Sequence, residues 1–259
     1  MKIFLGIYFT FLISNYFSQL KKLDDDILIQ TDRPDQTECP FIVPKNHLQI
    51  ENGFLIENLN STERTYFFPS TLWKFGINEK VELRLISEIT SEQKINETKK
   101  GLNPITFGFK LNILNEKGII PKTSLITHLR SIKIGSRNLN STYLAPSFRF
   151  TMQHQLSKKT TLGYNIGKEW DGETPKPIDI YTLTIGYSFN PKLSGYMEFF
   201  GYRQNIKKWN HQMDFGFTYL LKTNFMVDIS SGFELLKNTP IYYLSLGCSY
   251  RIKFTQSTK

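Results

Sequence analysis

The stretch DIYTLTIGYSF at residues 179–189 alternates apolar and small polar side chains without a break. A period of two is that of a β-strand, in which successive side chains point to opposite faces. One face would carry Tyr181, Leu183, Ile185, Tyr187 and Phe189, and the other Thr182, Thr184, Gly186 and Ser188. The stretch therefore predicts a strand with one apolar and one polar face.

The same alternation recurs along the chain, for example in PITFGFKLNIL at 104–114 and QMDFGFTYLL at 212–221. Turn residues separate the repeats. The pattern predicts about twelve strands, at 47–58, 64–76, 79–90, 103–114, 121–132, 142–155, 160–170, 179–190, 192–204, 209–221, 223–235 and 241–254. The stretches 64–76 and 121–132 alternate least regularly, and no helical stretch of useful length follows the N-terminal region.

The connections between these strands alternate in length. Short ones fall near 77–79, 115–118, 157–159, 190–192 and 222–224, and longer ones at 90–102, 133–141 and 171–178. Tight turns on one rim and longer loops on the other are typical of outer-membrane barrels. Because every backbone N–H must be paired in hydrocarbon, a membrane-spanning sheet has to close on itself. We therefore predict an all-β fold, a closed antiparallel transmembrane β-barrel of about 12 strands with short periplasmic turns and longer extracellular loops.

The N-terminus has the pattern of a secretory signal peptide. Lys2 precedes an apolar run at 3–13, and Ser18 is a suitable residue before a cleavage site. We expect a signal peptide at 1–18, a periplasmic N-terminal segment at 19–46, a barrel at 47–254 and a tail at 255–259. The segment 19–46 either enters the lumen or lies across its mouth as an extended lead-in. The expected location is the outer membrane of a Gram-negative bacterium.

Composition argues against several other classes of protein. The net charge of +9 is spread over predicted loops and turns, which does not favour nucleic-acid binding. Cys39 and Cys248 are too few for a disulfide framework, and in the predicted register Cys248 faces lipid, away from Cys39. No spacing of metal ligands and no phosphate-binding loop is present, so we expect no metal and no cofactor.

Aromatic residues fall near the predicted strand ends, where barrels place their interfacial girdles. The interfacial candidates are Trp73, Phe75, Trp170, Trp209, Tyr242, Tyr250 and Phe254. The last strand, YLSLGCSYRIKF at 243–254, resembles the C-terminal signal by which outer-membrane barrels are recognised for assembly, although TQSTK follows its final aromatic residue. The partners expected are outer-membrane lipid, lipopolysaccharide and the barrel-assembly machinery.

The first part of the expected mature chain contains a more specific motif than the strand pattern. TDRPDQTECPFIVPKNHLQIENGF at 31–54 combines a Thr-Asp-Arg-Pro step, a Thr-Glu pair and a Val-Pro that leads into the first strand. It resembles the opening of a family of outer-membrane barrels named for the meta-cleavage pathway of phenol degradation and often labelled as transporters. Cys39 and Asn46 depart from the small residue and the glycine expected at those places. The resemblance implies a barrel and transport, and it says little about the solute.

Strand phase predicts a charged lumen, and the polar segment 19–46 precedes it. The candidates for lumen or constriction residues are Asp32, Arg33, Asp35, Glu38, Glu51, Glu82, Arg84, Lys110, Arg130, Arg149, Glu198, Asp214 and Asp228. Such residues either select solutes along a polar channel or form cross-barrel ion pairs that fill a narrow interior.

Three functions remain open from the sequence. The first is a passive channel or transporter for small solutes, hydrophobic ones included, and not an enzyme. The second is a structural or interaction barrel with a blocked lumen and functional extracellular loops. The third and least supported is an outer-membrane lipid hydrolase, which would need a serine beside a histidine at the outer rim, with His211 the best placed. The solute and the oligomeric state are left open.

Overall fold

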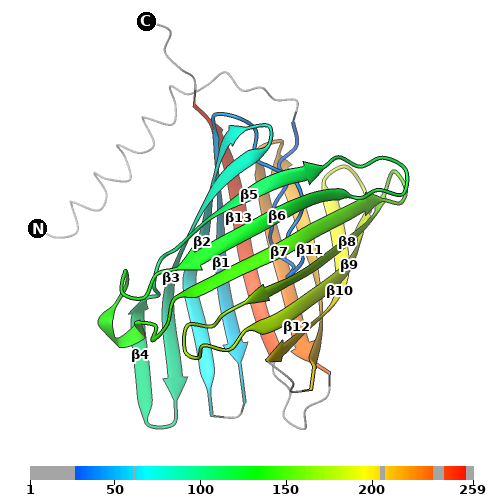
Figure 1. Ribbon diagram of the computed structural model, residues 1–259. Coiled ribbons are helices and arrows are strands. Elements are labelled where there is room, and N and C mark those ends of the chain that lie inside the picture. The colour runs from blue at the N-terminus through cyan, green and yellow to red at the C-terminus, as the bar shows by residue number, and fades with distance from the viewer. Residues whose placement is uncertain (1–26, 61, 205–207, 236–241, 255–259) are drawn as a thin grey trace, which may run out of the picture.

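The computed structural model of the protein describes residues 27–60, 62–204, 208–235 and 242–254, which form a closed antiparallel β-barrel (Figure 1). The expected signal peptide at 1–18 and the tail at 255–259 lie outside the described residues. The strands are β1 (His47–Asn58), β2 (Arg64–Asn78), β3 (Val81–Lys94), β4 (Glu97–Leu102), β5 (Thr106–Leu114), β6 (Lys122–Arg130), β7 (Ala145–Gln155), β8 (Thr160–Glu169), β9 (Ile178–Ser188), β10 (Leu193–Gln204), β11 (Asn210–Lys222), β12 (Phe225–Glu234) and β13 (Tyr242–Lys253).

The barrel closes through β1, which pairs with β2 on one side and with β13 on the other. Each of the remaining wall strands pairs with its neighbours along the chain, except that β3 pairs with β5 as well as β2. β4 pairs only with β3, so it lengthens one side of the wall without entering the closed ring. The prediction of a closed barrel of about twelve strands is therefore confirmed, with β4 as an additional strand.

The prediction of a loop at 90–102 is wrong. β3 continues to Lys94 and turns directly into β4. Glu92 lies opposite Lys99 and Lys94 opposite Glu97, so opposite charges face each other across the hairpin. This stretch is polar on both faces, which is why the apolar alternation gave no signal there. Of the other two predicted long loops, the one at 133–141 contains a short 3₁₀ helix, η1 (Arg137–Leu139), and the one at 171–178 joins β8 to β9.

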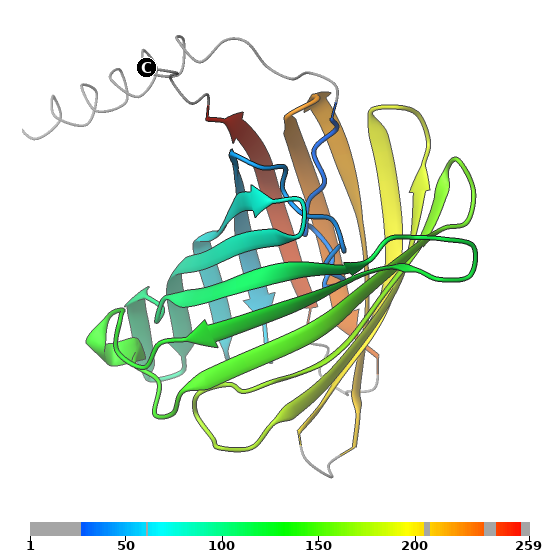
Figure 2. The same ribbon diagram turned by 45° about the horizontal axis from the view of Figure 1, so that its top comes forward.

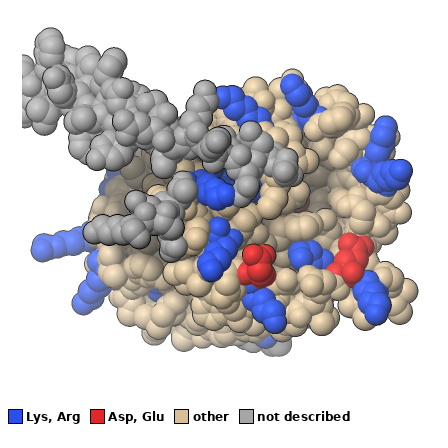
Figure 3. Space-filling view, turned by 90° about the horizontal axis from the view of Figure 1, so that it is seen from above, with Lys and Arg blue, Asp and Glu red and all other residues tan. Residues whose placement is uncertain are grey.

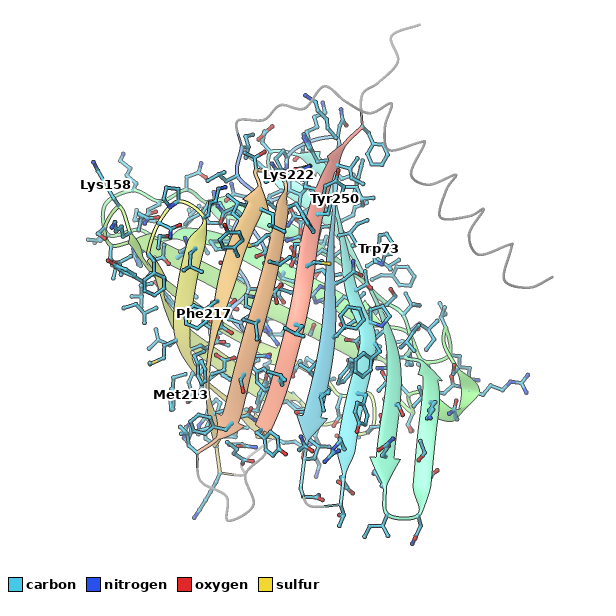
Figure 4. All side chains as sticks on the ribbon, turned by 180° about the vertical axis from the view of Figure 1, so that it is seen from behind. Trp73, Lys158, Met213, Phe217, Lys222 and Tyr250 are labelled. Atoms are coloured by element: carbon cyan, nitrogen blue, oxygen red, sulfur yellow. The ribbon has the colours of Figure 1, made fainter. Side chains whose placement is uncertain are left out.

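The outer surface of the wall is apolar. Leu183, Ile229 and Phe107 expose 47%, 44% and 48% of their surfaces, although each lies within a strand. Burial of polar groups inside and exposure of apolar ones outside is the arrangement of a barrel surrounded by lipid. The protein is thus an outer-membrane barrel. Figure 4 shows Trp73, Phe217 and Tyr250 on this surface.

Several of the predicted interfacial aromatic residues lie on the outside near strand ends. Trp73, Tyr242, Tyr250 and Phe254 are exposed, and the Phe75 ring lies 6.2 Å from that of Phe254. A second cluster forms near the longer loops, where Trp209 stacks edge-on to Tyr181 at 5.0 Å and lies under the Arg203 guanidinium at 4.7 Å. Trp170 is half-buried just beyond the end of β8.

The two rims differ as the connections predict. The described chain starts and ends at the rim of the short turns, where the Phe254 N–H donates to the Asn46 carbonyl at 2.8 Å. Figure 3 looks onto this rim and shows many lysine and arginine side chains with few acidic ones. Lys158 lies in one of its turns, and Lys222 is the last residue of β11 at this rim (Figure 4). The described residues contain no helix long and apolar enough to span a membrane.

Candidate functional site in the barrel lumen

Residues 27–46, called here the inner segment, run inside the barrel before β1 begins (Figures 1 and 2). The segment has almost no regular structure, so its backbone must be satisfied by other groups. The lumen wall supplies them. Side chains that bond to its main chain come from nine strands: Gln49 and Glu51 of β1, Glu82 of β3, Lys110 of β5, Ser124 of β6, Arg149 of β7, Asn165 of β8, Glu198 of β10, Ser230 of β12 and Arg251 of β13.

Asp32 is the centre of these contacts. Its carboxylate lies 2.9 Å from Lys74 Nζ, 3.0 Å from Arg84 Nη1 and 2.9 Å from Lys110 Nζ. All four side chains are almost wholly buried. Three cations from β2, β3 and β5 therefore converge on one carboxylate of the inner segment. A buried charge is tolerated only when it is paired in this way.

Two wall carboxylates complete this anchor. Glu51 lies 2.5 Å from Lys74 Nζ and accepts the backbone N–H groups of Asp32 and Arg33 at 3.0 and 3.2 Å. Glu82 accepts the Val43 N–H at 2.8 Å and lies 3.3 Å from Arg84 Nη1. The wall thus holds both the side chain and the main chain of the segment.

The Arg33 side chain lies against the inner face of the wall, over two glycines. Its guanidinium pairs with Asp228 of β12 at 2.9 Å and donates to Ser245 Oγ of β13 at 2.8 Å. Gly53 and Gly247 are partners in the β1–β13 ladder, and a Cβ on either would overlap this guanidinium. The position of the Arg33 guanidinium therefore requires a residue without a side chain at position 53, and both residues belong to the stretch 31–54.

The segment then crosses to the opposite wall. The Gln36 N–H donates to Glu198 at 2.7 Å, and Thr37 Oγ1 contacts both Glu198 and Thr182 Oγ1, the latter at 2.6 Å. Arg149 Nη1 donates to the Gln36 carbonyl at 3.2 Å. Glu38 returns toward the anchor, with its carboxylate 2.6 Å from Arg84 Nη2.

These surroundings set the protonation of the inner segment. Burial would raise the pKa of Asp32, but Lys110, Lys74 and Arg84 outweigh it and hold that pKa well below its usual value. Burial likewise opposes ionisation of Glu38, and Arg84 lowers its pKa nonetheless. Burial raises the pKa of the Cys39 thiol to about 12. Cys39 and Cys248 are both free.

A cavity of about 800 Å³ lies between the inner segment and the wall of β7 to β12. The segment contributes Pro34, Asp35 and Thr37, among others, and the wall Met152, Thr184, Tyr196, Thr218 and Met226. The turns at Lys158, Lys159 and Lys192 also border it, so the cavity reaches toward the rim of the short turns.

The sequence-based candidates do not all meet at the segment. Arg130 lies near the longer loops, where Nη1 donates to the Asp171 carbonyl at 3.4 Å. Arg149 joins the segment to Glu169, which lies 3.1 Å from its Nη2. Asp214 accepts from Tyr243 Oη, and Asp35 borders the cavity.

Sequence reasoning missed Lys74, although it is one of the three cations on Asp32. Its strand contains a β-bulge between Phe67 and Ser70, which disturbs the alternation and made 64–76 the least regular pattern. Trp73 faces outward, and this neighbour is the signal from which an inward Lys74 follows. His128 also lies beside the Asp32 anchor, with its Nε2 3.1 Å from Arg84 Nε.

His211 has aromatic surroundings. Its Nδ1 lies 2.6 Å from Tyr181 Oη, and its ring stacks on Phe199 at 5.5 Å. Within the described residues, no hydrogen bond joins it to a serine. The contact that a lipid hydrolase would need at this rim is thus absent from the described chain.

Comparisons with known proteins agree with this architecture. The most similar solved structures include the COG4313 outer membrane channel from Pseudomonas putida F1, with a TM-score of 0.61, 11% identity and coverage of 85% of this chain and 99% of that one. The KdgM porin in complex with disordered oligogalacturonate gives 0.55, 10%, 80% and 99% for the same quantities, and the NanC porin 0.53, 11%, 78% and 98%. At these identities the likeness is one of fold. No curated protein sequence matches the chain.

A family model described as "Putative MetA-pathway of phenol degradation" matches residues 31–252. The match begins at the Thr-Asp-Arg-Pro step and ends in the closing strand, so it covers the inner segment and the barrel together. The chain belongs to this family of outer-membrane barrels.

Proposed function

We propose that the protein is a passive outer-membrane channel for small solutes whose lumen is constricted by the inner segment. The observation that carries the proposal is the anchoring of Asp32 by Lys74, Arg84 and Lys110, which fixes an irregular segment inside the barrel. A segment held in this way narrows the lumen and sets the size and polarity of what passes.

The position of the cavity supports passage along one side. The ion pairs concentrate on β1 to β5, whereas the cavity lies toward β7 to β12. Its walls combine hydroxyl groups of Thr184 and Thr218 with the apolar side chains of Met152, Met226 and Leu220. Mixed walls of this kind suit small amphipathic solutes, including largely hydrophobic ones.

The test is single-channel conductance in planar bilayers. The full mature chain should conduct weakly, and a chain without residues 19–46 should conduct several times more. Deletion leaves three buried cations short of a partner, so its folding has to be checked by the heat-dependent shift in gel mobility typical of folded barrels.

A disulfide lock provides a second variant with the segment in place. Thr37 and Thr182 hold their hydroxyl oxygens 2.6 Å apart, so Thr37→Cys with Thr182→Cys should bond. Cys39 and Cys248 are replaced by alanine in this background. Reduction should raise the conductance or its fluctuations, and the single variant Thr182→Cys serves as the control that reduction leaves unchanged.

A barrel with a blocked lumen is the second candidate, and the many bonds between the segment and the wall favour it. The outer connections would then carry the function: 90–102, which contains the β3–β4 turn, 133–141, which contains η1, and 171–178. A folded protein that stays silent in both full and shortened forms would support this candidate against the channel.

The partners follow from the barrel surface. The lipid of the outer membrane covers the apolar wall, and we propose that lipopolysaccharide contacts its outer part. β13 presents Leu244, Leu246 and Tyr250 outward, followed by Phe254. This apolar stripe is the feature through which we propose recognition by the barrel-assembly machinery. Replacing Phe254 by serine should slow assembly and leave the stability of the assembled barrel nearly unchanged.

A further inference from the structure

Three carboxyl groups lie on the cavity side of the lumen, near enough to interact electrostatically. Asp35 of the inner segment borders the cavity. Glu198 of β10 and Asp214 of β11 are partners in the antiparallel ladder behind it. Both are almost wholly buried, and their charges act on Asp35. Within the described residues, no lysine or arginine forms an ion pair with any of the three.

The acids on the opposite side are different. Asp32 has three cations, Glu38 has Arg84, and Asp228 has Arg33. Among the described residues, Asp35, Glu198 and Asp214 therefore lack the ion-pair partners that the anchor acids have. The described cations that line the cavity are Arg33, which pairs with Asp228, and the rim residues Lys158, Lys159 and Lys192. A buried carboxyl without an ion-pair partner favours a cation from outside the protein.

Unsatisfied polar atoms point to the same place. Asp214 accepts from Tyr243 through Oδ2 and is hydrogen-bonded to Glu198. Its buried Oδ1 has no further partner among the described residues, but Asp214 is not among the residues that line the cavity. The Tyr196 hydroxyl has no hydrogen-bond partner in the described chain either, and Tyr196 lines the cavity. Asp35, Asp214 and Glu198 all lie close enough to act electrostatically on that hydroxyl. A buried polar group without a partner is destabilising, so a ligand that satisfies the Tyr196 hydroxyl is favoured.

We propose that this end of the cavity is a binding subsite for small organic cations, in which an ammonium group lies between Asp35 and the Tyr196 ring and an apolar body lies against Met152 and Met226. The proposal rests on the channel function and names a solute class for it. The Tyr196 ring adds a cation–π contribution. Within the described part of the chain, no three acidic, histidine or cysteine side chains are arranged to hold a metal ion, which favours a larger, more diffuse cation.

The subsite should bind cations more tightly as pH rises. Burial and the neighbouring Glu198 and Asp214 raise the pKa of Asp35 well above its usual value, with Asp32 adding to the effect. A bound cation stabilises the ionised carboxylate, so binding releases a proton from Asp35. The groups that face Asp35 are Glu198 and Tyr196 of β10 and Asp214 of β11.

The experiment measures binding to the folded mature protein in detergent by titration calorimetry. The probe is benzylammonium, a primary ammonium that can donate hydrogen bonds, with benzyl alcohol as the neutral and benzoate as the anionic comparison of similar size. The dissociation constant of the ammonium should be about tenfold lower than that of the alcohol, a difference in binding free energy equal to one pKa unit. Benzoate should bind more weakly than both. The affinity of the ammonium should rise with pH, because a carboxyl whose pKa is raised loses its proton only above its usual range.

The variants are Asp35→Asn, which removes the charge, and Tyr196→Leu, which removes the ring. Each should reduce the preference for the ammonium, and Asp35→Asn should also abolish its pH dependence. Glu79→Gln at an exposed turn is the matched charge control and should change neither. Equal binding of the three probes, or full retention of the preference in Asp35→Asn, would overturn the proposal.

Binding and conductance separate the two proposals. If the protein conducts but shows no preference for the ammonium, the subsite proposal is contradicted and the channel proposal stands. If every form of the protein is silent in bilayers but the ammonium binds through Asp35, the channel proposal is contradicted. The protein is then a barrel that binds cations.

Discussion

Asp32 of the inner segment and Lys110 of β5 form an ion pair of 2.9 Å in which the lysine side chain is wholly buried. The two residues are 78 positions apart in the chain. Lys110 Nζ also donates to the carbonyls of Cys39 and Phe41, at 2.8 and 3.3 Å. One wall lysine thus fixes the segment at two places, which makes the Asp32 anchor the point at which to disturb it.

Replacement of Asp32 by asparagine should loosen the segment. It leaves Lys74, Arg84 and Lys110 with fewer counter-charges in a buried site, and loss of one partner from such a site costs about 3–5 kcal/mol. We expect a lower free energy of unfolding in urea and larger current fluctuations in bilayers. Glu79→Gln, at an exposed turn, should change neither quantity. Unaltered stability and current in Asp32→Asn would show that the anchor does not hold the segment.

The anchor should resist mild acid. Because the pKa of Asp32 is held well below its usual value of 3.8, its contribution to stability is fully present above that value and is lost only as pH falls through the lower pKa of the folded state. Conductance should therefore show no opening attributable to this group between pH 7 and pH 5. An increase in that range that Asp32→Asn does not remove would have to come from other groups.

Bulk at Gly53 should displace Arg33. A Cβ at this position overlaps the Arg33 guanidinium, so Gly53→Val forces the arginine away from Asp228. Overpacking of this kind typically costs about 1–3 kcal/mol. Thermal unfolding measures the loss, and Arg33→Ala in the same background should recover part of it by making room. Gly118→Ala is the comparison in a turn with open space around it, although its positive φ of 59° brings a backbone cost of its own.

The Cys39 thiol reports on the inner segment. Its pKa of about 12 leaves very little reactive thiolate at neutral pH. In a Cys248→Ala background, a water-soluble maleimide should react slowly with the native chain and many times faster with Asp32→Asn. Equal rates in the two proteins would mean that the segment stays in place without its central ion pairs.

A charge on the lipid-facing wall should be costly. Ile229 lies near the middle of β12, opposite Leu246 of β13, and both are exposed on the outside. Ile229→Arg should lower stability in lipid vesicles by about 2–4 kcal/mol. Ile95, in the turn between β3 and β4, is 74% exposed, and Ile95→Arg should change stability by no more than about 0.5 kcal/mol. A similar cost at both positions would contradict the assignment of the membrane-facing band.

Local alternation was sufficient to predict most of the wall. The side chains of β9 and β11 face the sides that a period of two assigns them, because lipid outside and a polar lumen inside impose opposite demands on neighbouring residues. The alternation of apolar and polar residues gives no signal where those demands are absent. The hairpin of β3 and β4 is polar on both faces, and the bulge in β2 shifts the alternation before Lys74.

The sequence by itself determined the barrel, its two unequal rims and the charged character of its lumen, since each follows from a repeat of two and from the lengths of connections. Only the tertiary structure decided which charges meet. Asp32 finds Lys74, Arg84 and Lys110 because closure of the barrel brings β2, β3 and β5 around the inner segment. Asp35 lies only three residues after Asp32 but faces the other side of the lumen. Among the described residues, no cation forms an ion pair with it there. Pairing across a lumen depends on closure and register, and neither is written in the local pattern of a strand.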